Sequence, residues 1–188
     1  MEKRSQFRTR SIAFVGLSVA LLAVSAWITI PLGPVPFTMQ TFVCTFLLLA
    51  LSPSEALASL ALYVVLGAIG LPLFSGMSGG IGRIMGPTGG FLWGFVLGGI
   101  ALVGVLALAK RRSAAIEYLA AGAFLIVVYL AGWLQLAAVS GMGLEAAFLA
   151  GVAPFIVLDA IKIALAVPVA RAVRHAVGNR RSPSPAKL

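Results

Sequence analysis

Two charged side chains interrupt a strongly apolar stretch near the end of the chain. The stretch PFIVLDAIKIALA (154–166) contains Asp159 and Lys162. A spacing of three residues puts both side chains on one face of a helix, where they can partly neutralise each other. Because a single charge near the centre of a bilayer costs about 2.5–3.5 kcal/mol, the pair indicates a binding site that faces the inside of a helix bundle. The alternative is an ion pair that only holds this helix to its neighbours.

A third cation, Arg83, lies in the middle of a glycine-rich stretch. The segment GLPLFSGMSGGIGRIMGPTGG (70–90) holds eight glycines in 21 residues. A guanidinium is a good partner for a carboxylate because its donors form a planar fork; the alternative is a surface arginine among lipid headgroups. The spacing Gly80-x-Gly82-x-x-x-Gly86 does not match a dinucleotide-binding fingerprint, and no P-loop motif occurs. The glycines are therefore expected to let the backbone turn tightly and approach a ligand closely.

Neutral polar side chains complete the candidate site. Thr38 and Gln40 lie in PVPFTMQTF (35–43) and could bind an amide-like ligand, or Thr38 could simply cap the following helix. The chain has no carboxylate pair at a catalytic spacing and no His-Glu-x-x-His or Gly-x-Ser-x-Gly motif, and its one cysteine, Cys44, forms no zinc cluster. This inventory suits a small, mostly apolar ligand with a polar group at each end. It predicts neither an enzyme nor a metal or cofactor site.

The elements that carry these residues are predicted to be membrane helices. Of the 188 residues, 61% are hydrophobic and only 10% are charged, whereas a soluble domain carries about 25% charged residues. The apolar runs are continuous rather than alternating, which favours helices over a membrane barrel. We therefore predict an all-α membrane protein, a bundle of six transmembrane helices at 11–30, 40–51, 54–71, 86–109, 114–139 and 144–173. The second and third of these look short for a complete span.

Basic residues gather at three places along the chain. Twelve of the fourteen Lys and Arg residues fall within 3–10, 110–112 and 171–187, and with six spans these places lie on one side of the membrane. The positive-inside rule makes that side cytoplasmic, together with both termini. The formal net charge of +9 then reflects topology and attraction to membrane lipids rather than nucleic-acid binding. Glu55 and Glu117, near the same ends of their helices, are interpreted as structural.

The domain organisation follows from the same pattern. The bundle is expected to form one domain, 11–173, after a short cytoplasmic N-terminal segment, 1–10. The tail, 174–188, ends in the polar, Pro- and Ser-rich sequence GNRRSPSPAKL and is expected to be disordered.

Four segments, in this order, resemble the BioY family. They are PVPFTMQTF (35–43), LGAIGLP (66–72), SGGIGRIMGPTGGFLWGF (78–95) and PFIVLDAIKIALA (154–166). BioY proteins are the biotin-specific substrate-binding (S) components of energy-coupling-factor (ECF) transporters. The likeness covers about residues 11–172, which is nearly everything but the two ends of the chain.

The resemblance implies a fold, a ligand and partners. The fold would be the six-helix S-component bundle, which binds biotin near the extracellular side and takes it up across the bacterial cytoplasmic membrane. Loops after the first and third helices would roof the site. The partners would be a transmembrane coupling (T) component and cytoplasmic ATPase subunits, since this chain has no ATPase motif of its own.

The resemblance also assigns roles to residues already singled out. The acid and base of the last helix match Asp159 and Lys162, the loop arginine matches Arg83, and the loop polar residues match Thr38 and Gln40. Asp159 would accept hydrogen bonds from the ureido N–H groups of biotin, which are stronger when the acceptor is charged. Either Lys162 or Arg83 would bind the biotin carboxylate, and the sequence leaves that choice open.

Two further features follow from the family pattern. Gly80 would let the backbone come close to the ligand, and Phe91 stands where the family often has tyrosine, so a ring wall remains without its hydroxyl. An A-x-x-x-A pattern on the first helix of S components docks the T component. The nearest matches here are Gly16-x-x-x-Ala20 and Ala13-x-x-Gly16, and small residues at this spacing let helices approach closely.

Two other functions remain open at this point. One is an S component for a different vitamin. The other is an intramembrane enzyme that acts on lipid or peptide, against which the missing catalytic residues argue.

Overall fold

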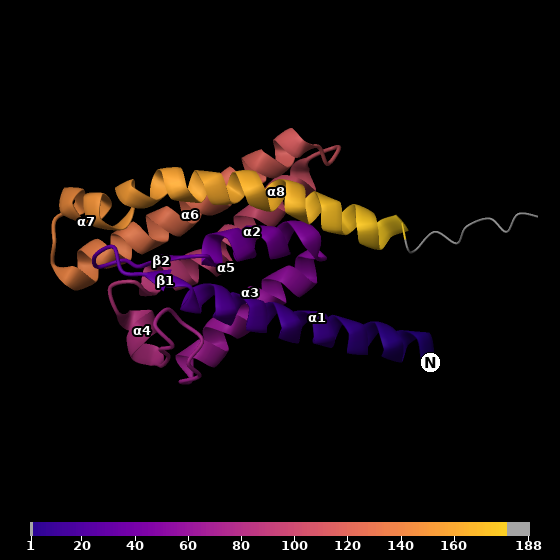
Figure 1. The fold of residues 1–188 in the computed structure, drawn as a ribbon, viewed down its shortest axis with the longest axis horizontal. Coiled ribbons are helices and arrows are strands. Elements are labelled where there is room, and N and C mark those ends of the chain that lie inside the picture. The colour runs from indigo at the N-terminus through magenta and orange to yellow at the C-terminus, as the bar shows by residue number, and fades with distance from the viewer. Residues whose placement is uncertain (1, 180–188) are drawn as a thin grey trace, which may run out of the picture.

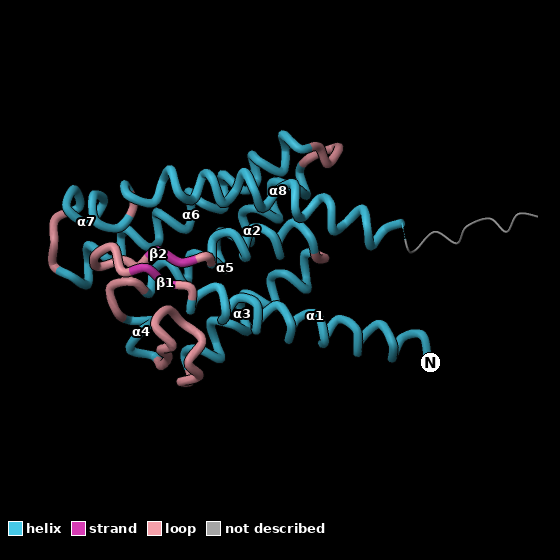
Figure 2. The backbone as a smooth tube through the Cα atoms, in the orientation of Figure 1, coloured by secondary structure: helices cyan, strands magenta, loops and turns pink. Residues whose placement is uncertain are grey.

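A computed structural model describes residues 2–179, and the rest of the predicted disordered tail, 180–188, lies outside the described residues. Long helices run along the molecule, with α1 and α8 at its two edges (Figures 1 and 2). The helices are α1 (Glu2–Trp27), α2 (Gln40–Ala50), α3 (Pro53–Ala68), α4 (Ile81–Met85), α5 (Gly89–Leu108), α6 (Ala114–Ser140), α7 (Leu144–Gly151) and α8 (Ile156–Asn179). The start of α1 and the end of α8 lie at the same end of the bundle, and α4 and α7 lie at the opposite end (Figure 1).

Length and composition divide these helices into two groups. Four stretches of the described residues are long and apolar enough to cross a membrane: Thr9–Trp27, Gly89–Leu108, Ala114–Ser140 and Leu144–Ala176. Helices α2 and α3 are apolar but have only 11 and 16 residues. The prediction that both would be short for a full span is confirmed, whereas six complete spans are not. Large apolar side chains are exposed around the outside of the bundle, as on a surface that contacts lipid.

The prediction of a single last helix at 144–173 is wrong. It is divided into α7, a 3₁₀ turn (Ala153–Phe155) and α8. Pro154 lies in that turn, where its missing N–H and its ring break the hydrogen-bond pattern of a helix. Helix α8 then runs past the predicted end, so residues 174–179, which were expected in the disordered tail, are helical. Residues 2–10, expected as a separate segment, belong to α1.

A short hairpin follows α1 and was not predicted. Strands β1 (Thr29–Ile30) and β2 (Phe37–Thr38) pair antiparallel, with Thr29 opposite Thr38. Three prolines at 31, 34 and 36 forbid helix between them. The hairpin lies at the end of the bundle away from the termini (Figure 2), and it brings β2 to the start of α2.

The ends of α3 and α6 are set by local capping. Ser52 and Glu55 form a capping box at the start of α3, with Pro53 in the first turn, where its lack of an N–H does no harm. The Ser113 side chain accepts a hydrogen bond from the Ile116 backbone at the start of α6. These short motifs explain why both predicted starts lie within one residue of the observed ones.

Glycines let α5 and α6 pack with their backbones in contact. A Cβ atom at Gly90 would lie 2.2 Å from the backbone oxygen of Ala131, and one at Gly94 would lie 2.9 Å from the Val128 Cα. Both distances are shorter than side-chain contacts allow. The spacing of four residues is the small-residue pattern of closely packed membrane helices. This contact holds α5 and α6 in a defined register.

The glycine contact makes a stability prediction. Gly90→Ala should lower the unfolding free energy by about 1–3 kcal/mol, because the new methyl group meets backbone that cannot move aside. Gly104→Ala is the matched control on the same helix, since nothing lies within 4 Å of a Cβ there. Thermal unfolding of the purified protein in detergent measures both. A loss of thermal stability in Gly104→Ala as large as that in Gly90→Ala would contradict this account of the packing.

Candidate functional site

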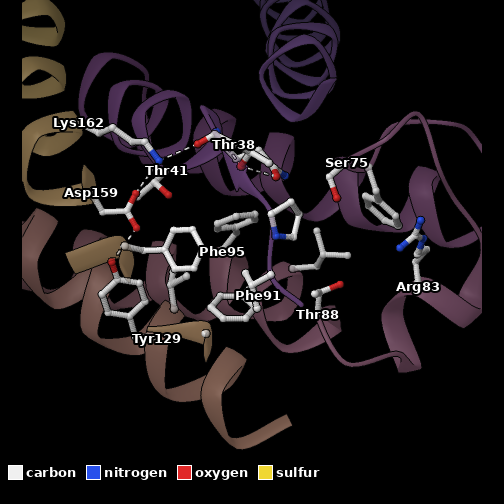
Figure 3. Close-up of a pocket in the computed structure, with 18 residues that line it drawn as sticks. Thr38, Thr41, Ser75, Arg83, Thr88, Phe91, Phe95, Tyr129, Asp159 and Lys162 are labelled. Carbon is white, nitrogen blue, oxygen red and sulfur yellow. Dashed lines mark hydrogen bonds and ion pairs between the residues drawn. The ribbon is translucent and has the colours of Figure 1, made fainter. Parts of the chain in front are cut away.

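A cavity of about 70 Å³ lies at the end of the bundle away from the termini (Figure 3). Residues from β2 and α2, from helices α4 to α8, from the 3₁₀ turn before α8 and from the loops beside them line it. The lining residues used below are Thr38, Gln40, Arg83, Phe91, Phe95, Tyr129, Asp159 and Lys162. Segments that are far apart in the sequence therefore meet around one small space.

The predicted ion pair is present in this cavity. Lys162 Nζ lies 2.7 Å from Asp159 Oδ1, and both residues are buried. The same ammonium donates a hydrogen bond of 2.7 Å to the backbone oxygen of Thr38. It also lies 3.9 Å from the centre of the Phe37 ring, close enough for a cation–π interaction. The pair thus joins α8 to β2 as well as facing the cavity.

Tyr129 is a member of the site that the sequence analysis missed. Its hydroxyl donates a hydrogen bond of 2.7 Å to Asp159 Oδ2. Each oxygen of the carboxylate therefore has one protein donor. A tyrosine in an apolar span needs a partner for its hydroxyl, and this was the only available signal. The 30 residues that separate Tyr129 from Asp159 left the partner itself unknown.

Thr38 and Gln40 both line the cavity and also bind each other. The Thr38 hydroxyl donates to Gln40 Oε1, and Gln40 Nε2 donates to the Tyr63 hydroxyl, each over 2.9 Å. Tyr63 in turn donates to the backbone oxygen of Leu73. The amide of Gln40 therefore ties the start of α2 to α3 and to the loop after it. Met39 is the N-cap residue of α2 and makes no side-chain cap, whereas the Thr38 hydroxyl accepts a hydrogen bond of 3.4 Å from the Gln40 backbone N–H at the start of this helix.

Arg83 lies across the cavity from the ion pair. It is exposed on α4, and Figure 3 shows it on the side away from Asp159 and Lys162. Gly80 is not among the lining residues. Its φ of +98° and its hydrogen bond of 2.7 Å to the Gly67 oxygen give it a conformational role at the start of α4.

Phe91 forms part of an apolar wall between the two polar ends. A Cβ atom at Gly132 of α6 would lie 2.3 Å from the Phe91 ring, so this glycine makes the space that the ring occupies. Phe95 lines the same wall (Figure 3). The prediction that Phe91 provides a ring wall agrees with this position.

Two side chains that the sequence analysis did not single out hold the roof of the cavity. Gln135 Nε2 donates to the backbone oxygens of Ile84 and Gly86, each over 2.8 Å. Trp27 Nε1 donates over 2.9 Å to the oxygen of Pro72. The glycine-rich segment is thus fastened to α6 and to the end of α1.

The predicted docking residues lie elsewhere. Ala13, Gly16 and Ala20 are all exposed on α1, and nothing lies within 4 Å of a Cβ built at Gly16. They are well placed to contact another helix. The described part of the chain holds no group of three or more His, Cys, Asp or Glu residues that could bind a metal ion.

The family model of BioY matches residues 1–179 of this chain. The chain belongs to the BioY family. The resemblance expected from the four sequence segments is thereby confirmed. It extends over the cavity, the ion pair and all the described helices.

Named relatives and a solved structure agree with this membership. The chain is 40% identical over 163 residues to the probable biotin transporter BioY of Pyrococcus horikoshii, covering 87% of this chain and 95% of the relative. It is 39% identical over 162 residues to the biotin transporter BioY of Thermotoga maritima, and the match covers 86% of this chain and 94% of that relative. The crystal structure of the S-component for biotin from an ECF-type ABC transporter superposes with a TM-score of 0.81 at 22% sequence identity. The superposition covers 90% of this chain and 93% of that chain. This BioY-family chain therefore has the S-component fold.

The ion pair of this BioY-family chain makes a second stability prediction. Lys162→Met should lower the unfolding free energy by about 3–5 kcal/mol, because it leaves a buried carboxylate without its cation. The double variant Asp159→Asn/Lys162→Met should regain much of that loss, since no buried charge remains. Thermal unfolding in detergent compares them, with Lys110→Met as a control that removes an exposed lysine. A double variant no more stable than Lys162→Met would argue against charge burial as the cause.

Proposed function

We propose that this protein binds biotin in the cavity and is the substrate-specific subunit of an ECF transporter in the bacterial cytoplasmic membrane. One observation carries the proposal: a single cavity has a buried acid–base pair at one end, an arginine at the other and phenylalanine rings between them. Biotin has the matching order of groups, with a ureido ring, an apolar bicycle and a carboxylate. The relatives named as biotin transporters support the same ligand.

The acid–base pair suits the ureido ring. Each oxygen of Asp159 accepts one hydrogen bond from the protein, and a carboxylate oxygen has a second lone pair for a ligand N–H. Lys162 uses two of its three donors on Asp159 and Thr38, so the third can point at the ureido oxygen. A ligand here meets groups that are already held in place, which reduces the entropy lost on binding.

Arg83 is the better candidate for the carboxylate of biotin. Lys162 is committed to Asp159, and a ligand carboxylate beside it would also lie close to the Asp159 charge. Arg83 stands at the other end of the cavity (Figure 3). Its guanidinium can bind a carboxylate through two parallel hydrogen bonds. We therefore assign the ureido end to α8 and the carboxylate end to α4.

The roof must move to admit biotin. Ligand pockets commonly have volumes of about 300–1,000 Å³, whereas this cavity has about 70 Å³. The covering elements are the hairpin and the glycine-rich segment, which lack the long helix–helix contacts of the bundle. Outward movement of one or both of them would open the site toward the extracellular side.

The membrane arrangement is part of the proposal. Six crossings by α1, α2, α3, α5, α6 and α8 put both termini on the cytoplasmic side, in keeping with the common end at which α1 starts and α8 ends. Helix α2 has 11 residues and is about 16 Å long. Its crossing is completed by non-helical chain that other helices cover, as irregular backbone at membrane depth requires. The T component would contact the exposed small residues of α1, and ATPase subunits would supply energy.

Biotin and its methyl ester test the assignment of the two ends. Arg83→Gln should weaken biotin binding about tenfold or more, because a hydrogen bond to a charged group contributes roughly 1.5–3 kcal/mol. The same variant should bind the methyl ester as the unmodified protein does. Asp159→Asn should weaken both ligands by similar factors, because the ureido ring is the same in both. Equilibrium binding of labelled biotin, with unlabelled ester as competitor, measures both affinities for the unmodified protein and for each variant.

The controls of this experiment address the function itself. Excess thiamine or riboflavin should not displace labelled biotin from the purified protein. Displacement by either vitamin, or biotin binding no tighter than micromolar, would refute biotin as the ligand. An equal loss of both biotin and its ester in Arg83→Gln would instead remove Arg83 from the carboxylate end.

The docking face gives a separate prediction. Gly16→Leu should leave biotin binding unchanged but reduce copurification of the T component and biotin uptake by co-expressed subunits, because the larger side chain keeps two helices apart. Gly104→Leu is the control, since it also adds a side chain where nothing lies within 4 Å of a Cβ. Equal assembly of both variants with the T component would exclude this face as the contact.

A further inference from the structure

A second polar cluster lies at the opposite end of the bundle from the cavity. Glu117 of α6 is fully buried, and three arginines surround it. Arg112 Nε lies 2.8 Å from Oε1, Arg171 Nη1 lies 3.4 Å from Oε2, and Arg174 Nη2 binds Oε1 as well. The sequence analysis interpreted Glu117 as structural, and these contacts agree with that part of its role.

The arginines also cap the end of α2. The backbone oxygen of Leu49 accepts hydrogen bonds from Arg112 Nη2 over 2.7 Å and from Arg174 Nη1 over 2.6 Å. Carbonyl groups in the last turn of a helix have no partner within the helix. The cluster thus joins α2, α6 and α8, and the loop between α5 and α6, at one end of the bundle.

These structural contacts leave an excess of positive charge. Three guanidinium groups face one carboxylate, which leaves two positive charges in the cluster. Together the three groups donate five hydrogen bonds to Glu117 and Leu49, whereas each guanidinium alone has five N–H donors. Burial and then the charge of Arg174 lower the pKa of Arg112, although Glu117 opposes this shift. A further anion would relieve the repulsion between the arginines.

The cluster opens into a hollow at the boundary of the predicted spans. The hollow has a volume of about 390 Å³ and is lined by Glu117, the three arginines and His175. One apolar span begins at Ala114 and another ends at Ala176, so the hollow lies where both spans end. Phosphate groups of lipids lie at this level of a membrane. A phosphate oxygen is also a strong partner for the planar fork of arginine.

We propose that this hollow is a binding site for the phosphate of an anionic phospholipid headgroup. Arg171 is its main ligand-binding residue, because its contact with Glu117 is the longest of the three and because the hydrogen bonds to Leu49 come from Arg112 and Arg174. Arg112 and Arg174, which also hold Leu49, form the fixed part of the site. The chemistry recognised is a phosphate with net negative charge, for which soluble phosphate is the alternative source. The site is independent of the ligand in the cavity.

Lipid titration of the purified full-length protein in detergent tests the proposal. Phosphatidylglycerol should raise the unfolding temperature in a saturable way, and phosphatidylcholine should do so much less. Arg171→Gln should raise the half-saturating concentration of phosphatidylglycerol about tenfold or more, because it removes direct hydrogen bonds to a charged phosphate. Arg111→Gln is the matched control: it removes the same charge from an exposed neighbour outside the hollow. It should raise that concentration by about fivefold at most, the effect of one cation near an anionic lipid surface.

Additional measurements distinguish lipid phosphate from soluble phosphate and detect variants that do not fold. Inorganic phosphate at constant ionic strength should raise the unfolding temperature little if a lipid headgroup is the ligand. If it does raise the unfolding temperature, and Arg171→Gln reduces that increase, the same site binds soluble phosphate. Binding of labelled biotin by each variant checks that it is folded. If Arg171→Gln does not fold, Arg171→Lys replaces it and should still weaken phosphatidylglycerol more than Arg111→Gln does. Equal effects of the variants at positions 171 and 111, or equal stabilisation by both lipids, would overturn the proposal.

Discussion

The buried pair of Asp159 and Lys162 is the interaction on which the ligand-binding end of this protein depends. A charge in the apolar interior persists only if it is paired and hydrogen-bonded. Lys162 therefore binds both the carboxylate and the Thr38 backbone, and Tyr129 binds the other carboxylate oxygen. These contacts draw α6, α8 and β2 together around the cavity. The same requirement that stabilises the pair thus produces a preorganised polar site.

Both ends of the bundle contain buried charged side chains, but the two ends balance these charges differently. At the cavity, one acid and one base are balanced, and the space beside them is small. At the other end, Glu117 is surrounded by three arginines, so the local charge is positive and the hollow is larger. The acid–base pair suits the neutral hydrogen-bonding end of a ligand, and the arginine cluster suits an anion. The apolar middle of the bundle, with its glycine contacts between α5 and α6, keeps the two ends apart.

Rigid and irregular parts of the structure also have separate roles. Backbone contacts at Gly90 and Gly94 hold α5 against α6, which fixes the positions of Phe91 and Tyr129. The hairpin and the glycine-rich segment cover the cavity with mostly irregular chain, which is held by hydrogen bonds such as those from Gln135 and Trp27 and by the buried side chains of Phe74 and Ile84. Irregular chain with fewer packed contacts can open at less free-energy cost than a packed helix pair. A binding protein that must admit and release its ligand needs this difference.

Sequence alone determined the membrane class, the family and the residues that carry charge, because these depend on composition, apolar length and local spacing. The pair at positions 159 and 162 could be predicted, since residues three apart share a helix face. Only the tertiary structure brought Tyr129 to Asp159 and put Arg83 at the other end of the cavity, because those relations join distant segments. The structure also shows that Gly80 is not among the residues that line the cavity. Pro154 divides the predicted last helix, whereas Pro168 lies inside α8, so only the tertiary structure showed which proline ends a helix.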